Sequence, residues 1–181
     1  MANIVLYIGN IGRRKNQGQI IESFKLLPES LAINTYIFFI GAIIDSDYDI
    51  VQMVSKSGYS KHFIICGIVD KEDIPIYYSQ GNAVALMSVS EGFGLSLIEG
   101  MHFGLPCMAF SDIDAFEDIF DDSAMIGVNA HDDESVKNGL KLLLSRDWDK
   151  SKIIEYSKKF EPQIMAKNYV QVYKREIQYS A

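Results

Sequence analysis

Short apolar runs alternate with amphipathic stretches along most of this chain. Each apolar run has the length of one buried strand, and the runs cover residues 4–8, 35–40, 63–66, 83–87 and 106–110. Their apolar residues are continuous, which is typical of a parallel sheet covered on both faces. Between the runs, apolar residues recur at helical spacing, as in Ile20, Ile21, Phe24 and Leu27. The pattern predicts an α/β fold with a doubly wound, Rossmann-like parallel sheet.

The pattern changes after Ser145, where the chain becomes helical and polar to its end. The expected packing positions of this segment are apolar or aromatic: Ile153, Tyr156, Phe160, Ile164, Tyr169 and Tyr173. The sequence shows no linker, repeat or low-complexity tract. At 181 residues and 48% hydrophobic content, the chain can bury a core without disulfides. We therefore predict one domain over residues 1–181, closed by a helical segment over residues 146–181.

Composition limits the class of partner and the compartment. The net charge of -7 argues against nucleic acid as the main partner, because phosphate backbones require clustered cations. Cys66 and Cys107 lie in apolar runs, as expected for reduced thiols of a cytoplasmic protein. The first residues lead directly into a predicted strand, and no apolar run reaches the ~18 residues of a membrane span. We expect a soluble, cytoplasmic domain.

Candidate chemistry gathers in the loops that follow the predicted strands. These loops span residues 9–15, 41–45, 67–70 and 88–94. The carboxyl ends of parallel strands share one edge of the sheet, where ligands of such folds bind. The first loop carries the cations Arg13, Arg14 and Lys15. We expect a phosphate-containing ligand at this edge.

The most specific segment runs from Glu91 to Glu99 and reads EGFGLSLIE. Gly92 and Gly94 let the backbone approach a ligand closely, and a helix that begins near Leu95 or Ser96 would direct free N–H groups at a phosphate. Glu99 would lie one turn into this helix and face the same opening. Ser96 and Glu99 also fit a capping box, which would account for these two residues but not for Glu91 or the glycines. Both interpretations can hold together.

With these features, nearly the whole chain resembles the C-terminal, donor-binding half of group 1 (family four type) glycosyltransferases of the GT-B fold. The landmarks occur in the family's order: YIGNIGRRKN, FFIGA, IICGIV, SVSEGFGLSLIEGMHFGLPC, and an acidic segment before the closing helices. The fourth landmark is highly specific, and the others are weak singly.

The resemblance implies roles for the charged residues. Lys15 matches the lysine that neutralises the donor diphosphate and the departing nucleotide, and Arg14 would assist it. Glu91 matches the glutamate beside the transferred sugar. Glu99 matches the glutamate that binds the ribose hydroxyls. Lys15 and Glu91 are therefore the expected catalytic residues.

The resemblance also implies backbone contacts with the donor. Ile68, which follows Gly67, lies where the family recognises the base. Sugar hydroxyls and phosphate oxygens would be held by the backbone around Phe93, Gly94, Leu95 and Ser96.

The same resemblance implies a retaining transfer from a UDP- or GDP-sugar to a glycan or lipid-linked acceptor, in the synthesis of cell-surface polysaccharide or lipopolysaccharide. No metal or other cofactor is expected. The family's N-terminal acceptor domain is absent from this chain, so we expect donor binding but no transfer by these residues alone. Any peripheral contact with the inner face of the membrane would be made through the missing domain.

Three departures from the family pattern stand out. Asn10 follows the first glycine, where an arginine is usual, so Arg13 or Arg14 must supply the second cation. Gly100 replaces the usual alanine after Glu99. The loop after the fifth strand carries Asp112-Ile113-Asp114, and a D-x-D can hold a metal-bound diphosphate in another glycosyltransferase fold.

Other functions remain as alternatives. A non-catalytic nucleotide-binding or scaffolding module would share the donor site. A GT-B-type sugar-nucleotide epimerase or phosphorylase would need further catalytic residues or a cofactor lysine, and the sequence offers no candidate. A nicotinamide dehydrogenase is disfavoured, because residues 9–13 lack the full glycine pattern of the dinucleotide fingerprint.

Overall fold

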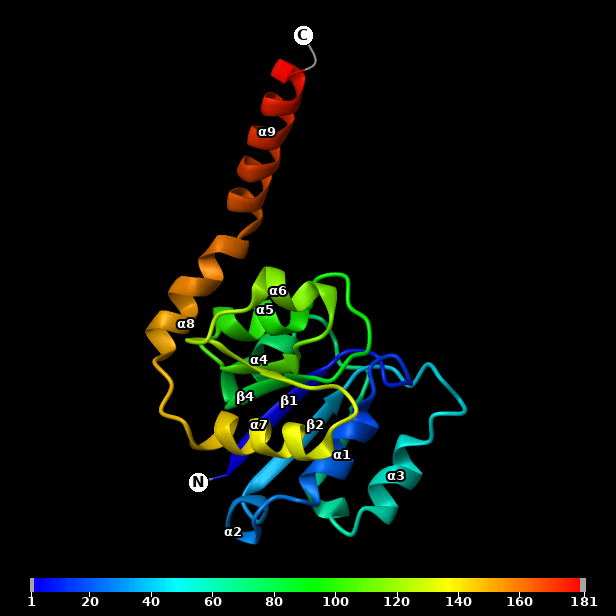
Figure 1. Ribbon diagram of the computed structural model, residues 1–181. Coiled ribbons are helices and arrows are strands. Elements are labelled where there is room, and N and C mark those ends of the chain that lie inside the picture. Colours follow the sequence, from blue (N-terminus) through cyan, green and yellow to red (C-terminus); the bar gives the residue numbers. More distant parts are fainter. Residues whose placement is uncertain (1, 180–181) are drawn as a thin grey trace.

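The computed structural model describes residues 2–179, apart from the side chains of residues 114, 176, 178 and 179. A six-stranded sheet runs through the centre, and every strand pair in it is parallel (Figure 1). The strands are β1 (Asn3–Ile8), β2 (Thr35–Ile40), β3 (Phe63–Gly67), β4 (Ala83–Leu86), β5 (Cys107–Phe110) and β6 (Met125–Val128). Their spatial order is β3-β2-β1-β4-β5-β6. The predicted doubly wound, Rossmann-like sheet is confirmed.

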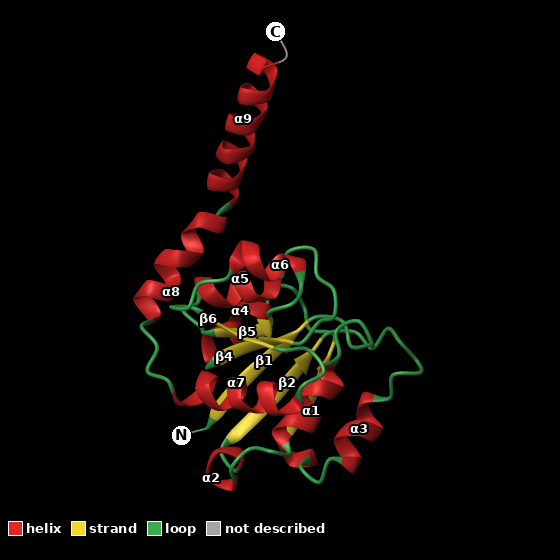
Figure 2. Cartoon of the chain, viewed as in Figure 1, coloured by secondary structure: helices red, strands yellow, loops and turns green. Residues whose placement is uncertain are grey.

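Helices cover both faces of this sheet (Figure 2). On one face, α1 packs against α7, and on the other, α5 packs against β4, β5 and α8. The α-helices are α1 (Gln17–Phe24), α2 (Glu29–Ala32), α3 (Ile50–Lys56), α4 (Ile74–Gln80), α5 (Leu95–His102), α6 (Asp114–Ile119), α7 (Asp133–Ser145), α8 (Lys150–Ser157) and α9 (Pro162–Tyr179). Short 3-10 helices occupy Ser60–His62 (η1) and Lys158–Phe160 (η2).

The sequence-based prediction missed strand β6. Its four residues, Met125–Val128, include a glycine and follow an acidic segment, so the apolar run is too short to stand out. Pairing along the whole length of β5 makes it a strand. The five predicted strands agree with β1 to β5 to within one residue at each end.

The C-terminal segment is helical, as predicted, but its last helix does not pack as expected. Ile153 on α8 is fully buried, whereas Tyr169 and Tyr173 on α9 are largely exposed. Figure 1 shows why, since α9 extends away from the body of the domain. The prediction that both tyrosines are packing positions is therefore wrong for this chain. None of the helices in the described part of the chain is long and apolar enough to cross a membrane.

Gly100 permits a close approach between α5 and the sheet. A Cβ atom at this position would lie 2.4 Å from Cγ2 of Val84 on β4 and 3.7 Å from the ring of Tyr78 on α4. Val84 is fully buried and its branched side chain cannot move aside. The glycine therefore has a packing function, which the sequence did not reveal.

This contact predicts that Gly100→Ala destabilises the domain, although alanine is the better helix former by about 1 kcal/mol. Overpacking of a filled core costs roughly 1–3 kcal/mol, so the net change is a lower urea midpoint. The matched test adds Val84→Ala, which removes the obstructing methyl groups. Gly100→Ala should cost less in that background, and an increase in stability in the wild-type background would contradict the prediction.

Candidate functional site

The candidate site lies where β1 and β4 are neighbours in the centre of the sheet. The chain leaves β1 toward β2 on one side and continues from β4 toward β5 on the other. At such a point the two following loops diverge and leave a crevice at the carboxyl ends of the strands. The loop of residues 9–16 and the loop of residues 87–94 border this crevice. The first carries the cations, and the second carries the glycines and Glu91.

Direct hydrogen bonds join these two loops. The Val89 N–H donates to the Arg14 carbonyl at 3.0 Å. The Arg14 guanidinium donates to the Ser90 carbonyl, with 2.9 Å between Nη1 and the oxygen. The two loops therefore hold each other in one arrangement.

Lys15 and Glu91 form the charged centre of the site. The Lys15 ammonium donates to Oε1 of Glu91, and both side chains are largely buried, with 13% and 10% exposed. Nη1 of Arg14 lies 3.5 Å from the same oxygen. Two cations thus share one carboxylate, which leaves an excess positive charge at the crevice. The structure brings together these three residues that the sequence singled out.

Gly9 gives Lys15 its path across the end of β1. Its φ of 148° favours glycine, and a Cβ atom there would lie 3.1 Å from Cε of Lys15. The aliphatic part of Lys15 consequently crosses the Gly9 backbone, and its ammonium group reaches Glu91.

Arg13 and Arg14 separate into different roles. The Arg13 guanidinium lies 3.7 Å from the Asp45 carboxylate and 3.8 Å from that of Asp47, and its side chain is 65% exposed. Arg13 thus joins the loop after β2, while Arg14 contacts Glu91. Of the two candidates for the second cation, the structure places Arg14 at the crevice.

Sequence reasoning missed the role of Tyr7. This residue is fully buried in β1, and its hydroxyl donates to the Lys15 carbonyl. The same oxygen accepts from the Met87 N–H at 2.7 Å. Burial raises the pKa of Tyr7 well above its ordinary value, so the group stays a donor across the physiological pH range. A hydroxyl within an otherwise apolar strand was the available signal.

The glycine-rich loop leads into α5 as expected, but the helix begins differently from the capping box. Its N-cap is Gly94, with a φ of 72° and no side-chain cap, and Leu97 is the first residue to donate back to the Gly94 carbonyl. Ser96 therefore lies inside the helix and cannot cap it. The capping-box interpretation is wrong. The N–H groups of Leu95 and Ser96 precede the first helical hydrogen bond and point out of the helix start.

These loops border an open cavity of about 380 Å³. Its lining combines the charged pair with the start of α5: Ile8, Lys15, Glu91, Gly92, Phe93, Gly94, Leu95 and Ser96. The cavity thus offers a cation, a carboxylate and free backbone amides at one place. This combination suits a sugar or phosphate group.

Glu99 faces an adjoining cavity of about 480 Å³ between α4 and α5. Ile8 lines both cavities and joins them. The expectation that Glu99 faces the same opening as Glu91 therefore needs correction, because its side chain points toward α4. Its partner is Tyr78 on α4, whose hydroxyl lies 2.8 Å from Oε2 of Glu99.

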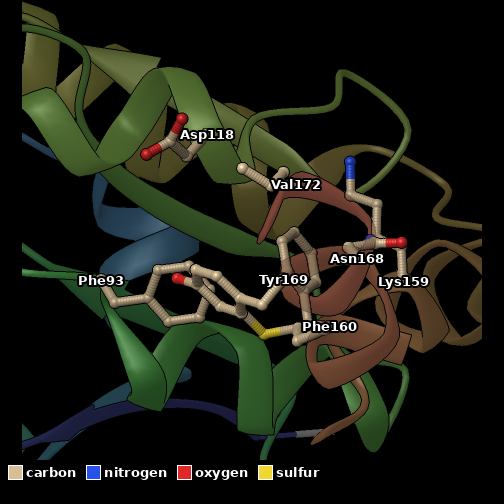
Figure 3. A pocket seen from close by; sticks show the side chains of 8 residues that line it. Phe93, Asp118, Lys159, Phe160, Asn168, Tyr169 and Val172 are labelled. Atoms are coloured by element: carbon tan, nitrogen blue, oxygen red, sulfur yellow. The ribbon is translucent and has the colours of Figure 1, made fainter. Parts of the chain in front are cut away.

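Ile68 lies apart from this centre, and the ring of Phe93 extends from it toward the C-terminal helical segment. Ile68 follows the edge strand β3, is 81% exposed and is not among the residues that line either cavity. The Phe93 ring packs edge-on against Phe160, with 5.9 Å between the ring centres. Figure 3 shows Phe93 pointing toward Phe160 and Tyr169, with which it lines a second pocket. The predicted contacts of Ile68 with the base and of Phe93 with sugar or phosphate oxygens would therefore be made by their backbone groups.

The D-x-D alternative stays a prediction. Asp112 is exposed after β5, and the side chain of Asp114 lies outside the described residues. Within the described part of the chain, no cluster of three or more His, Cys, Asp or Glu side chains could hold a metal ion. Both cysteines are free thiols.

The strand order, the switch-point crevice and its cations define a Rossmann-like domain of the kind that forms one half of a GT-B protein. Residues 1–160 match the model of the family described as glycosyl transferases group 1. The match covers well over half of the chain, and the chain therefore belongs to the group 1 glycosyltransferases.

Two curated relatives are similar in sequence to this chain, and in each the match covers only part of the relative. An uncharacterized 41.2 kDa protein in the cps region of Klebsiella pneumoniae is 26% identical over 173 residues, or 94% of this chain and 46% of that protein. The O-antigen chain mannosyltransferase B of Escherichia coli is 26% identical over 121 residues, or 67% of this chain and 32% of that protein. This chain thus spans less than half the length of these relatives.

Solved structures show the same fold. The apo form of the lipopolysaccharide outer core galactosyltransferase WaaB superposes with a TM-score of 0.82 at 17% identity, over 97% of this chain and 50% of that chain. HepE of Anabaena in complex with UDP gives a TM-score of 0.76 at 17% identity, over 99% of this chain and 49% of that chain. The likeness at this identity concerns the fold.

The hydroxyl of Tyr7 predicts a specific loss of stability in Tyr7→Phe. Its removal leaves the Lys15 carbonyl and the Met87 amide without their buried partner, which costs roughly 1–3 kcal/mol. Urea unfolding measures this loss. Tyr36→Phe is the matched control, because it deletes the same atom from a half-buried tyrosine on the next strand. Equal effects of the two substitutions would contradict the assignment.

Proposed function

We propose that this chain is the donor-binding domain of a glycosyltransferase that transfers a sugar from a UDP- or GDP-sugar to a glycan or lipid-linked acceptor. The observation that carries the proposal is the largely buried Lys15–Glu91 pair, with Arg14 beside it, at the opening of the α5 helix. An excess cation and free helical amides at a switch point suit a nucleoside diphosphate.

The cations act on the leaving group. Breakage of the bond between sugar and phosphate builds negative charge on the departing nucleotide, so Lys15 and Arg14 stabilise the transition state more than the ground state. The Lys15 ammonium has three donors and can keep Glu91 as a partner while it binds phosphate oxygen. Glu91 then stands beside the transferred sugar, where its carboxylate can orient a hydroxyl or stabilise positive charge at the anomeric carbon.

The rest of the donor extends along α5. The backbone at Phe93, Gly94, Leu95 and Ser96 would donate to sugar hydroxyls and phosphate oxygens. The ribose would lie in the adjoining cavity, where the Glu99 carboxylate can accept from two hydroxyls. The backbone at Ile68 would contact the base.

The names of the relatives support a place in cell-surface polysaccharide or lipopolysaccharide synthesis. We further propose a retaining transfer without a metal or other cofactor. The positive charges of Lys15 and Arg14 would take the place of a metal ion. A cytoplasmic location fits both the nucleotide-sugar donor and the free thiols of Cys66 and Cys107. Acceptor binding and any membrane contact are assigned to parts of the protein outside this chain.

Calorimetric titration with UDP, GDP and ADP tests the donor site. We expect binding of UDP or GDP, and a roughly 10- to 100-fold loss of affinity in Lys15→Ala, since a charge-assisted hydrogen bond contributes about 1.5–3 kcal/mol. Lys25→Ala is the control, because Lys25 pairs with Glu22 on the surface of α1. Unchanged affinity in Lys15→Ala would refute the phosphate site.

Glu91→Gln separates the sugar from the nucleotide. Because Glu91 is assigned to the sugar, we expect nearly unchanged affinity for UDP or GDP but weaker binding of the corresponding nucleotide sugar. Equal weakening of both ligands would instead assign Glu91 to the support of Lys15 alone.

Isolated residues 1–181 should bind the donor without transferring its sugar. Both cavities open to solvent at the edge of the sheet, and transfer requires an acceptor site and exclusion of water. The measurement is nucleotide release in the presence of donor and candidate acceptors. Sustained turnover by this chain alone would contradict the expectation.

A further inference from the structure

Tyr78 on α4 makes the contact that fixes the Glu99 carboxylate. Its hydroxyl lies 2.8 Å from Oε2 of Glu99 and 3.1 Å from the Ser96 carbonyl. The tyrosine is 2% exposed, while Glu99 borders the cavity between α4 and α5. A buried donor on one helix thus holds a ligand-facing acceptor on the next, and the two helices lie side by side over one face of the sheet (Figure 1).

Packing of the ring does not account for the hydroxyl. The Tyr78 ring stacks on Phe103, with 5.4 Å between ring centres, and a phenylalanine could make the same contact. The hydroxyl has one proton and places it between two oxygens of α5. Burial, followed by the nearby Glu99 charge, raises the pKa of Tyr78 well above its ordinary value. The group therefore remains a donor across the physiological pH range.

We propose that Tyr78 is a positioning residue for donor binding, because its hydroxyl holds Oε2 of Glu99 and leaves Oε1 directed toward the ribose hydroxyls. The inference rests on the proposed function, in which Glu99 binds the ribose. Glu99 has three rotatable side-chain bonds, and a free glutamate loses this freedom when a ligand binds. The hydrogen bond from Tyr78 removes that freedom before the nucleotide arrives.

The contact itself is tested without any ligand. Urea unfolding of Tyr78→Phe, Glu99→Ala and the double variant forms a double-mutant cycle. We expect the effects to be non-additive, with Tyr78→Phe costing much less once Glu99 is alanine. Tyr77→Phe is the matched control on the same helix, since its hydroxyl faces Cys66 instead, and its effect should add to that of Glu99→Ala. Additive effects of Tyr78→Phe and Glu99→Ala would overturn the proposal.

The positioning role is tested with two forms of the nucleotide diphosphate that binds, either UDP or GDP, and its 2′,3′-dideoxy analogue. The wild type should bind the ribose form more tightly. Tyr78→Phe should weaken the ribose form by roughly fivefold, as for one hydrogen bond, and leave the dideoxy form unchanged. Tyr77→Phe should change neither affinity.

Four other results have distinct meanings. Equal weakening of both ligands in Tyr78→Phe would show a structural role only and would overturn the inference, as would no change in either. If the wild type binds both forms equally, the ribose role of Glu99 fails, and the inference fails with it. If the wild type binds no nucleotide, the proposed function fails, while the unfolding cycle still reports on the contact between Tyr78 and Glu99.

Discussion

A single buried hydroxyl connects the two loops on which the candidate site depends. The Tyr7 side chain reaches from β1 to the backbone of Lys15 on one loop and Met87 before the other. The Met87 amide is buried and the Lys15 carbonyl is partly buried, and buried backbone groups need a protein partner. The hydrogen bonds between Arg14 and residues 89 and 90 then extend this connection to the surface. The cations and the glycine-rich loop consequently form one rigid unit at the switch point.

The charges of the site are arranged around that unit. Removing Lys15 and Glu91 from water is costly, and their direct contact offsets much of the cost. Arg14 adds a second positive charge at the exposed side of the pair. In the proposed donor site, an incoming diphosphate would therefore meet cations whose positions are already set, so binding would require little further ordering of the protein. The Glu99 side chain is also ordered before a ligand binds, because the Tyr78 hydroxyl on the neighbouring helix is hydrogen-bonded to it.

Local patterns in the sequence predicted most of the fold and the charged residues of the site. Strands β1 to β5 were visible because a strand buried on both faces requires a continuous apolar run. Strand β6 was not visible, because Gly127 interrupts an apolar run of only four residues. Pairing with β5 nevertheless makes these residues a strand. The capping box was also a wrong prediction, because spacing along the chain does not fix where a helix begins. Ser96 and Glu99 have the right spacing, but Gly94 starts the helix in a conformation that leaves no cap position for Ser96.

The amino-acid pattern was enough to predict which residues follow each strand. It therefore also predicted that Lys15, Glu91 and Glu99 belong to one edge of the sheet. Spacing along the chain carries this information because parallel strands all point the same way. The packing of the folded chain places Arg14 rather than Arg13 beside Glu91. It also brings the hydroxyls of Tyr7 and Tyr78 to Lys15 and Glu99, and it packs Val84 against Gly100. These contacts join side chains on different elements and loops, and such contacts leave no periodic signal in the sequence.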